Sequence, residues 1–372
     1  MGVVIRKPGV LTTIQDIGRY GNQRNGFSVN GAMDKRAFEK ANILVDNSKT
    51  APAMEFVLAG PRLRFTTSTI FALTGANFNA KLNDKPVECY RAIYARRGSI
   101  LELTAPKSGM YGYLAIAGGG FAVPSVMGSA STNIKCGFGG FKGRNLEIGD
   151  YIESVTTEVD FLPYYESHRI ATDDDFYSFG DDEIEIRVVM GPEDDAFTST
   201  GIARFFGSAY TTTGRCDRMG YRLDGAKVEA KETSDIISEA VCAGAIQIPT
   251  DGHPIVMMAD CQTTGGYAKI ASVATVDIPK LVQRSQGKKV KFVPISVEEA
   301  QNLLINEART IRKLARHVKR PSAGSVSPRR TARRLTPILE KQALTNTKEH
   351  LWIKTASLPR RVGNRNNLEH IS

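Results

Sequence analysis

Short apolar runs separated by turn residues fill the stretch from residue 61 to residue 152, and this pattern constrains the fold more than any other feature. The runs include Ile70 to Leu73 and Met110 to Ala117, and Asn83-Asp84 has the composition of a hairpin turn. Many short strands at regular spacing with few helices are typical of a closed or nearly closed β-barrel. We therefore predict a mainly β fold.

The second half of the chain has the same character. Ile184 to Met190, Ile255 to Ala259, Ile270 to Val276 and Lys289 to Val293 are runs of strand length that are rich in Ile and Val. Each half also closes on a similar strand pattern around a glycine. This similarity favours two related barrels.

Three helices are predicted among the strands, one of them from the acidic stretch after Gly191 to about Phe206. Apolar residues at helical spacing follow Asp34, which is placed to be the N-cap of a helix from Lys35 to Val45. Ser296 is a capping-type residue in front of a last helix that runs to about Val318.

The length of 372 residues favours two domains, and an acidic stretch around Asp173-Asp174-Asp175 is typical of the link between them. The tail after the last helix is rich in Ser, Pro, Arg and Lys. The predicted boundaries are a first barrel domain at 1–153, an acidic linker at 154–182, a second barrel domain at 183–300, a C-terminal helix at 301–320 and a basic, disordered tail at 321–372.

The net charge of +10 belongs to the C-terminal region. Residues 311–372 hold 15 Lys and Arg against 3 Asp and Glu, which leaves 34 against 36 for residues 1–310. Attraction to a phosphate polymer would therefore be a property of the tail. We expect the tail to be a solvated extension, with nucleic-acid binding as the alternative.

Cysteines, histidines and the lengths of the apolar runs exclude several classes of protein. The five cysteines are scattered without a Cys-x-x-Cys pair, which is typical of a reducing compartment. Only His168 and His253 lie in the body of the chain, so we expect no histidine-based metal site. No apolar run is long enough to span a bilayer, and no secretory signal is visible. We expect a cytoplasmic protein.

A polar decapeptide from Asp260 to Lys269 lies between two of the apolar runs. It holds an acid, an amide, two hydroxyls, a phenol and an amine, and Gly265-Gly266 allows the backbone to approach a ligand closely. We predict a loop that joins two strands of one sheet. Loops on a rigid sheet are where binding groups gather, so ligand contact is one interpretation, and a glycine turn with solvated neighbours is the other.

Three further stretches gather polar groups beside turns. The first follows a predicted strand and contains Gln15, Asp16 and Arg19, of which the last two form either a local ion pair, which we favour, or a fork for a carboxylate ligand. The other two are Asp217 to Leu223 and Gly244 to Pro254, the latter with Gln247 in its strand and Asp251 in its turn.

Several well-known motifs are missing. Gly128 to Thr132 resembles a nucleophile elbow but lacks the G-x-S-x-G spacing and a histidine placed as its base. The sequence has no G-x-x-x-x-G-K-[ST] loop, no H-E-x-x-H and no Met-Lys-Met-type biotin attachment site. If ATP or carboxybiotin takes part, another polypeptide carries much of its handling.

Six stretches, in this order, resemble the biotin-dependent carboxyltransferase family. They are Gly9 to Arg19, Gly31 to Asp34, Leu73 to Ala76, Gly128 to Thr132, Asp217 to Leu223 and Gln262 to Tyr267. That family includes the C subunit of 5-oxoprolinase, also called the Kip antagonist, and the allophanate-hydrolase subunit 2 domain of urea amidolyase. The resemblance spans about residues 3 to 300 and implies two cyclophilin-like β-barrel domains. It also implies a hetero-oligomer with a B subunit, which is an allophanate-hydrolase subunit 1-like protein, and the A subunit is a further candidate.

The resemblance implies an enzyme that works as part of a complex, an ATP-dependent 5-oxoprolinase that opens 5-oxo-L-proline to L-glutamate. One alternative is a carboxyltransferase that acts on urea or another amide with carboxybiotin. The other is a non-catalytic antagonist that binds a kinase-inhibitor partner. Both enzymes polarise an amide-like group, which suits cationic, amide and acidic groups held in place.

Motif matches and residue chemistry together give the candidate site. We expect ATP to be handled with a partner subunit, and we expect no biotin to be attached to this chain. The candidate catalytic residues are Asp217, Arg218, Asp251, Asp260 and Lys269. The candidate substrate-binding residues are Gln15, Arg19, Tyr221, Arg222, Gln247, Gln262, Thr263, Thr264, Gly265, Gly266 and Tyr267. Two positions depart from the family pattern: Cys261 stands where Arg is usual and Ala268 where Pro is usual, and Cys cannot replace the planar fork of a guanidinium.

Overall fold

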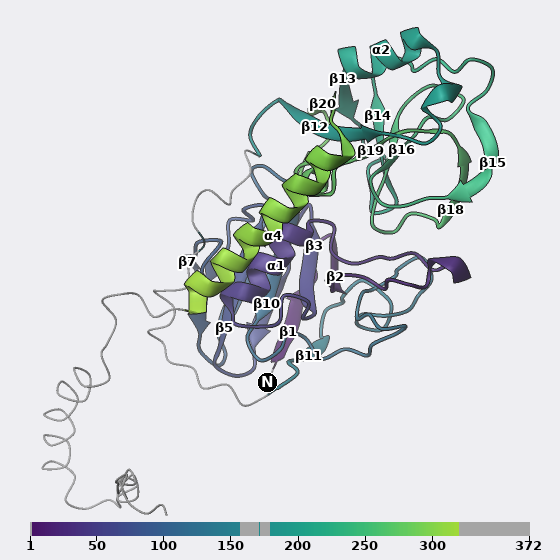
Figure 1. The fold of residues 1–372 in the computed structure, drawn as a ribbon. Coiled ribbons are helices and arrows are strands. Elements are labelled where there is room, and N and C mark those ends of the chain that lie inside the picture. Colours follow the sequence, from purple (N-terminus) through teal and green to yellow (C-terminus); the bar gives the residue numbers. More distant parts are fainter. Residues whose placement is uncertain (1, 157–170, 172–178, 320–372) are drawn as a thin grey trace, which may run out of the picture. The chain divides into compact units, whose positions relative to one another are not determined.

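The computed structural model describes residues 2–156, 171 and 179–319, and it shows a mainly β protein with few helices (Figure 1). The fold class predicted from the sequence is confirmed. All described residues belong to one compact unit. Most of the predicted acidic linker and the whole predicted basic tail lie outside the described residues, and the domain boundaries stay a prediction.

Two antiparallel sheets form the first half of the chain. The larger has the strand order β11-β1-β4-β9-β6-β7 and the smaller the order β2-β3-β10-β5-β8. The strands are β1 (Gly2–Lys7), β2 (Leu11–Gln15), β3 (Ala53–Val57), β4 (Arg62–Phe65), β5 (Thr69–Gly75), β6 (Lys81–Leu82), β7 (Lys85–Pro86), β8 (Ala92–Ala95), β9 (Ile100–Glu102), β10 (Tyr111–Ile116) and β11 (Tyr151–Glu153).

The smaller sheet is buried on both faces. On one face it shares a core with the larger sheet, which contains Ile5 of β1 and Phe56 of β3. The other face is covered by helix α1 (Lys35–Leu44), whose Phe38 belongs to a second core with Ala72 of β5. Burial on both faces explains why β5 and β10 are mostly apolar in the sequence instead of alternating.

Helix α1 begins at the cap that the sequence predicts. Asp34 Oδ1 accepts a hydrogen bond of 2.8 Å from the backbone N–H of Ala37. The other carboxylate oxygen accepts one of 2.8 Å from Nε2 of Gln283, which comes from the second half of the chain. Burial raises the pKa of Asp34.

The second half closes into a seven-stranded barrel of order β12-β19-β16-β17-β14-β13-β20, completed by the parallel pairing of β12 with β20. Its strands are β12 (Glu183–Met190), β13 (Ala209–Thr212), β14 (Gly220–Asp224), β16 (Ala245–Gln247), β17 (Ile255–Met257), β19 (Lys269–Val273) and β20 (Lys289–Pro294). Helix α2 (Ser199–Gly207) packs on β20, where the rings of Phe205 and Phe292 stack with centroids 4.7 Å apart. The short helices are η1 (Gln23–Asn25), η4 (Asp194–Ala196), η5 (Thr275–Asp277) and α3 (Ile278–Val282).

Helix α4 (Val297–Lys319) runs across α1 (Figure 1). It begins with a capping box, in which Glu299 N–H donates to Ser296 Oγ at 3.1 Å and Ser296 N–H donates to Glu299 Oε2 at 2.8 Å. This confirms the start predicted at Ser296. The apolar stripe that α4 buries in the core around α1 consists of Ile311, Leu314 and Val318.

The decapeptide from Asp260 to Lys269 differs from the predicted loop. Thr264–Tyr267 forms strand β18, which pairs with β15 (Asp235–Ala240) in a separate two-stranded sheet. Strand signals rest on β-branched and aromatic side chains, and Gly265-Gly266 has none, whereas strand pairing uses backbone groups. The loop prediction was therefore wrong for these four residues and for Lys269, which is the first residue of β19.

Asp277 is a fully buried carboxylate that joins η5 to β12. Its Oδ2 accepts hydrogen bonds from the backbone N–H of Arg187 at 2.9 Å and from Nε at 2.8 Å, and Oδ1 accepts one from Nη2 at 2.5 Å. Lys280 Nζ lies 3.1 Å from Oδ1. Burial alone would raise the pKa of Asp277, but the contacts with Arg187 and Lys280 outweigh it, and the pKa is lowered.

Asp277→Asn is expected to lower the free energy of unfolding by about 1.5–3 kcal/mol at neutral pH, because the hydrogen bonds to Arg187 lose their charge. The folded pKa lies below the unfolded value of about 3.9, so this stability is present above that value and is lost as the pH falls through the folded pKa. Urea unfolding over a pH series measures it. If the free energies of unfolding of the wild type and Asp277→Asn differ by the same amount at every pH down to about 2, the lowered pKa of Asp277 is wrong.

Candidate functional site

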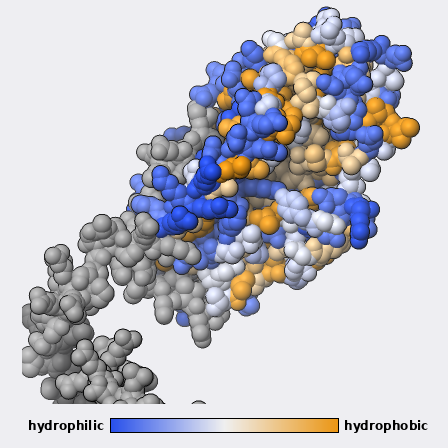
Figure 2. Space-filling model, in the orientation of Figure 1, coloured by the Kyte–Doolittle hydropathy of each residue, from blue (hydrophilic) through white to orange (hydrophobic). Residues whose placement is uncertain are grey.

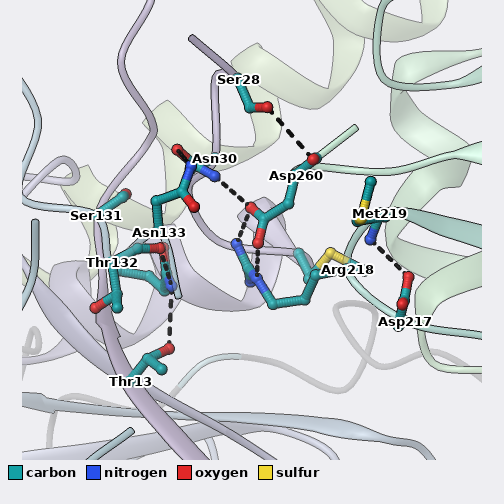
Figure 3. A network of polar contacts seen from close by, with 12 residues as sticks. Thr13, Ser28, Asn30, Ser131, Thr132, Asn133, Asp217, Arg218, Met219 and Asp260 are labelled. Atoms are coloured by element: carbon teal, nitrogen blue, oxygen red, sulfur yellow. Dashed lines mark hydrogen bonds and ion pairs between the residues drawn. The ribbon is translucent and has the colours of Figure 1, made fainter. Parts of the chain in front are cut away.

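A buried ionic network centred on Arg218 joins the two halves of the chain (Figure 3). The guanidinium binds Asp260 through two hydrogen bonds of 2.8 Å, Nε to Oδ2 and Nη2 to Oδ1. Nη1 donates to Oε1 of Glu55 in the first half, and Nη2 also donates to the carbonyl of Gly31 at 2.7 Å. Burial alone would lower the pKa of Arg218, but Asp260 and Glu55 outweigh it and the pKa is raised, so the guanidinium stays charged.

Glu55 is an acid of this network that the sequence motifs did not indicate. It lies in β3 and is only 3% exposed. Its Oε2 accepts hydrogen bonds from the hydroxyl of Tyr113 at 2.7 Å and from the backbone N–H of Met33 at 2.8 Å. Burial raises the pKa of Glu55, while Arg218 acts in the opposite direction. An acid inside the apolar run Ala53–Val57 was the signal that could have revealed it.

Asn30 connects Asp260 to Arg19 and was also missed. Its Nδ2 donates to Asp260 Oδ1 at 2.7 Å, and its Oδ1 accepts from Nη1 of Arg19 and, at 3.2 Å, from Nδ2 of Asn133. Its backbone N–H donates to the carbonyl of Ala259 at 2.9 Å. The φ of 58° is one that asparagine adopts more readily than most residues. Three predicted site residues, Arg19, Arg218 and Asp260, are thus brought together.

Within the described residues, Asp16 and Arg19 take different partners instead of the favoured local ion pair. Asp16 Oδ1 accepts hydrogen bonds from Oγ of Ser129 at 2.6 Å and of Ser131 at 2.5 Å. Arg19 Nη2 donates to the carbonyl of Ser131 at 2.5 Å, and the guanidinium lies 4.7 Å from the ring centroid of Phe138. Both serines are therefore anchors for the Gln15 to Arg19 loop.

Gln15 and Tyr221 are buried, with partners inside the fold. Gln15 Nε2 donates to Oγ1 of Thr13 at 3.0 Å and to the carbonyl of Thr132 at 3.2 Å. The Tyr221 hydroxyl donates to the carbonyl of Val282 at 2.8 Å, and burial raises its pKa well above the usual value. Both contribute to the frame of the site.

A second cluster of predicted residues surrounds Lys269. Its Nζ lies 3.1 Å from Oε1 of Glu193 and 3.4 Å from Oε2 of Glu239. Gln247 Nε2 donates to the carbonyl of Tyr267 at 3.2 Å. The remaining predicted residues of β18 are Thr264, Gly265 and Gly266. The Lys269 side chain is 9% exposed, so its charge is held between two acids rather than offered to solvent.

Three predicted residues are exposed and occupy turns or strand surfaces. Asp217 Oδ1 accepts a hydrogen bond of 2.8 Å from the backbone N–H of Met219, and Asp251 Oδ1 accepts one of 3.0 Å from that of His253. Arg222 lies on the exposed side of β14. Their contacts are those of turn braces and surface groups.

A groove of about 820 Å³ lies beside the ionic network, between α1, α4 and the loops that precede β16 and β18; we call it the α4 groove. Gln262 and Thr263 line it together with Ser28 and Asn30, so Asn30 belongs to both the network and the groove. This volume is within the usual range of sites for small molecules. Figure 2 shows a hollow at this place, beside the hydrophilic surface of α4.

The two departures from the family pattern have structural consequences. Cys261 lines the α4 groove but is only 7% exposed, and burial raises the pKa of its thiol to about 12. It is therefore a neutral, apolar part of the wall where a guanidinium would have offered an anion contact. Ala268 is fully buried, and its backbone N–H donates to the carbonyl of Ser234 at 2.8 Å, a bond that proline could not make.

In the part of the chain that the structure describes, no group of three or more His, Cys, Asp and Glu side chains is placed to hold a metal ion. No helix there has the length and apolar character needed to cross a membrane.

Comparisons with known proteins give a consistent result. A family model described as carboxyltransferase domain, subdomain A and B, matches residues 25–294. The chain is 38% identical to the C subunit of 5-oxoprolinase from Haemophilus influenzae over 78% of its own length and 90% of that protein, and 38% identical to the C subunit from Escherichia coli over 84% and 97%. Among solved structures, K. lactis urea amidolyase matches with a TM-score of 0.79 and 29% identity, over 88% of this chain and 20% of that one.

Proposed function

This chain belongs to the family of the carboxyltransferase domain, subdomain A and B, and on that premise we propose that it is the C subunit of an ATP-dependent 5-oxoprolinase complex. In this complex it acts with the B subunit, and with the A subunit, to open 5-oxo-L-proline to L-glutamate. The proposal is supported by the two relatives named as C subunits of 5-oxoprolinase, which match over nearly their whole length, whereas the urea amidolyase chain is about five times longer than its matched part.

The polar end of the α4 groove is the proposed substrate site. 5-Oxo-L-proline carries a carboxylate and a lactam amide on a small ring. Gln262 and Thr263 present an amide and a hydroxyl there, and Lys35 adds a cation that no acid of the same lining pairs with. This combination of hydrogen-bonding groups with excess positive charge suits an anionic cyclic amide.

The ionic network positions this wall. Asp260 precedes Cys261, Gln262 and Thr263 in the chain, and its carboxylate is fixed by two hydrogen bonds from Arg218 and one from Asn30. Rigid placement of binding groups is worth several kcal/mol in a catalysed reaction. Arg218 and Asp260 therefore act as positioning residues in this proposal.

ATP, handled together with the partner subunit, would supply a phosphoryl group to the lactam oxygen and leave as ADP. Water would then break the ring C–N bond, whose nitrogen becomes the free amine, and release the phosphoryl group as phosphate. The residues of this chain bind the carboxylate, orient the lactam and hold the wall in place.

Gln262→Leu and Thr263→Val are each expected to raise the KM for 5-oxo-L-proline about tenfold, because each removes a hydrogen bond to the substrate. The measurement is ATP-dependent glutamate release by the chain co-purified with its B and A subunits. Gln301→Leu, an exposed position of α4 outside the groove, is the matched control and should leave KM unchanged.

Two results would count against the proposal. The first is no glutamate release beyond that of the partners alone. The second is carboxylation of urea or another amide by carboxybiotin in the same assembly, which would favour the alternative carboxyltransferase function.

A further inference from the structure

The α4 groove is larger than a small cyclic amide requires, and its two ends differ. The end at Gln262 and Thr263 carries polar groups, whereas α4 contributes both apolar and charged side chains. The apolar ones are Leu304, Ala308, Ile311 and Ala315, which recur at the spacing of one helix face, and the charged ones are Glu307 and Arg312.

The facing wall comes from both halves of the chain and also has apolar members. It contains Ile43 of α1 and Ile278 and Pro279 of α3. Opposite them, Ala308 and Ala315 have small side chains that leave room for another backbone to approach α4. An amphipathic helix can lay its apolar face against apolar side chains at this spacing.

The charge of the groove lining indicates the sign of the charge that a bound partner should carry. Four cations and two acids line the groove: Lys35, Arg36, Lys49, Arg312, Glu39 and Glu307. Each acid lies 3.3 Å from a cation of the same lining, which leaves the charge of Lys35 and Arg312 in excess. Complementary charges orient a partner and speed its association.

We propose that an amphipathic helix of the partner B subunit docks in the α4 groove. Its apolar face packs against Ala308 and Ala315, and its carboxylates face Arg312, which leaves Lys35 to the substrate. The proposal rests on the proposed function, which makes this chain one member of a complex. The docked helix covers the apolar length of the groove and leaves the polar end at Gln262 for the substrate, so that docking completes the substrate site.

The test is the affinity of the purified chain for its purified B subunit, measured by calorimetry. Ala308→Trp fills the groove without touching the core, since Ala308 is exposed, and is expected to weaken binding about tenfold or more. Thr310→Trp places the same side chain on the exposed part of α4 outside the groove and should stay within about twofold of the wild type.

A charge reversal provides a second arm. Arg312→Glu is expected to weaken binding and to reduce its dependence on salt, whereas Lys313→Glu, one position along the helix and outside the groove, should do neither. Unchanged affinity in both Ala308→Trp and Arg312→Glu, or an equal loss in the two controls, would overturn the docking site while the 5-oxoprolinase assay stands. A wild-type chain that neither binds the B subunit nor supports glutamate release would overturn both proposals.

Discussion

Replacing Arg218 with methionine is expected to lower the free energy of unfolding by about 3–5 kcal/mol. The guanidinium is the cation for two carboxylates, Asp260 and Glu55, and Glu55 is only 3% exposed within β3. Methionine fills part of the same space but leaves Glu55 charged in a region of low dielectric without its partner. Unfolding in urea, followed by circular dichroism, measures the loss.

Arg222→Met is the matched control, because Arg222 is exposed on the neighbouring strand β14, and it should change the free energy by less than about 0.5 kcal/mol. The pH dependence gives a further check. Burial already raises the pKa of Glu55, and without Arg218 it rises further, so the carboxyl takes up a proton and the loss of stability shrinks as the pH falls. A loss below about 1 kcal/mol at neutral pH would show that the ion pair between Arg218 and Glu55 does not stabilise the contact between the two halves of the chain.

Gly139→Ala is expected to destabilise the protein by about 1–3 kcal/mol more than Gly137→Ala. Both glycines lie in one loop with left-handed φ values, 71° and 69°, so both variants carry the same backbone strain. A Cβ at Gly139 would overlap the carbonyl oxygen of Ser131 and lie 2.9 Å from Nη2 of Arg19, whereas a Cβ at Gly137 would meet nothing within 4 Å. The difference therefore measures packing alone.

The same pair of variants tests the function of the network. Because the Ser131 carbonyl accepts a hydrogen bond from Arg19, its displacement in Gly139→Ala should reach Asn30 and the wall of the α4 groove. We expect a raised KM in the assembled complex for Gly139→Ala only. Equal unfolding free energies and equal KM values for the two variants would exclude the close packing seen here.

The sequence predicts the fold well because the signals for it are local. Apolar runs mark the strands, and Asp34 and Ser296 mark two helix starts within a few residues of the groups that they cap. Strand β18 was not predicted because it pairs through the backbone of a polar, glycine-rich segment, which has no alternating side-chain pattern.

The candidate site is harder to predict because its members are far apart in the chain. Arg19, Arg218 and Asp260 can each be selected for their chemistry, but the groups that join them cannot. Glu55 is 163 residues from Arg218, and Asn30 is 230 residues from Asp260. A single sequence contains no local signal for such contacts. From the sequence, Asp217 and Asp251 therefore look as suitable for the site as Asp260 does, but in the structure they are exposed turn residues.

The large sequence separation of these contacts also means that their two members are synthesised at different times. Glu55 emerges 163 residues before Arg218, and Asp34 emerges 249 residues before Gln283, which is roughly ten to fifty seconds of translation at about 5–20 residues per second. During that interval Glu55 lacks only the guanidinium of Arg218, and Asp34 lacks the amide of Gln283. The contacts that join the two halves therefore form last, because they close some of the longest loops in the chain.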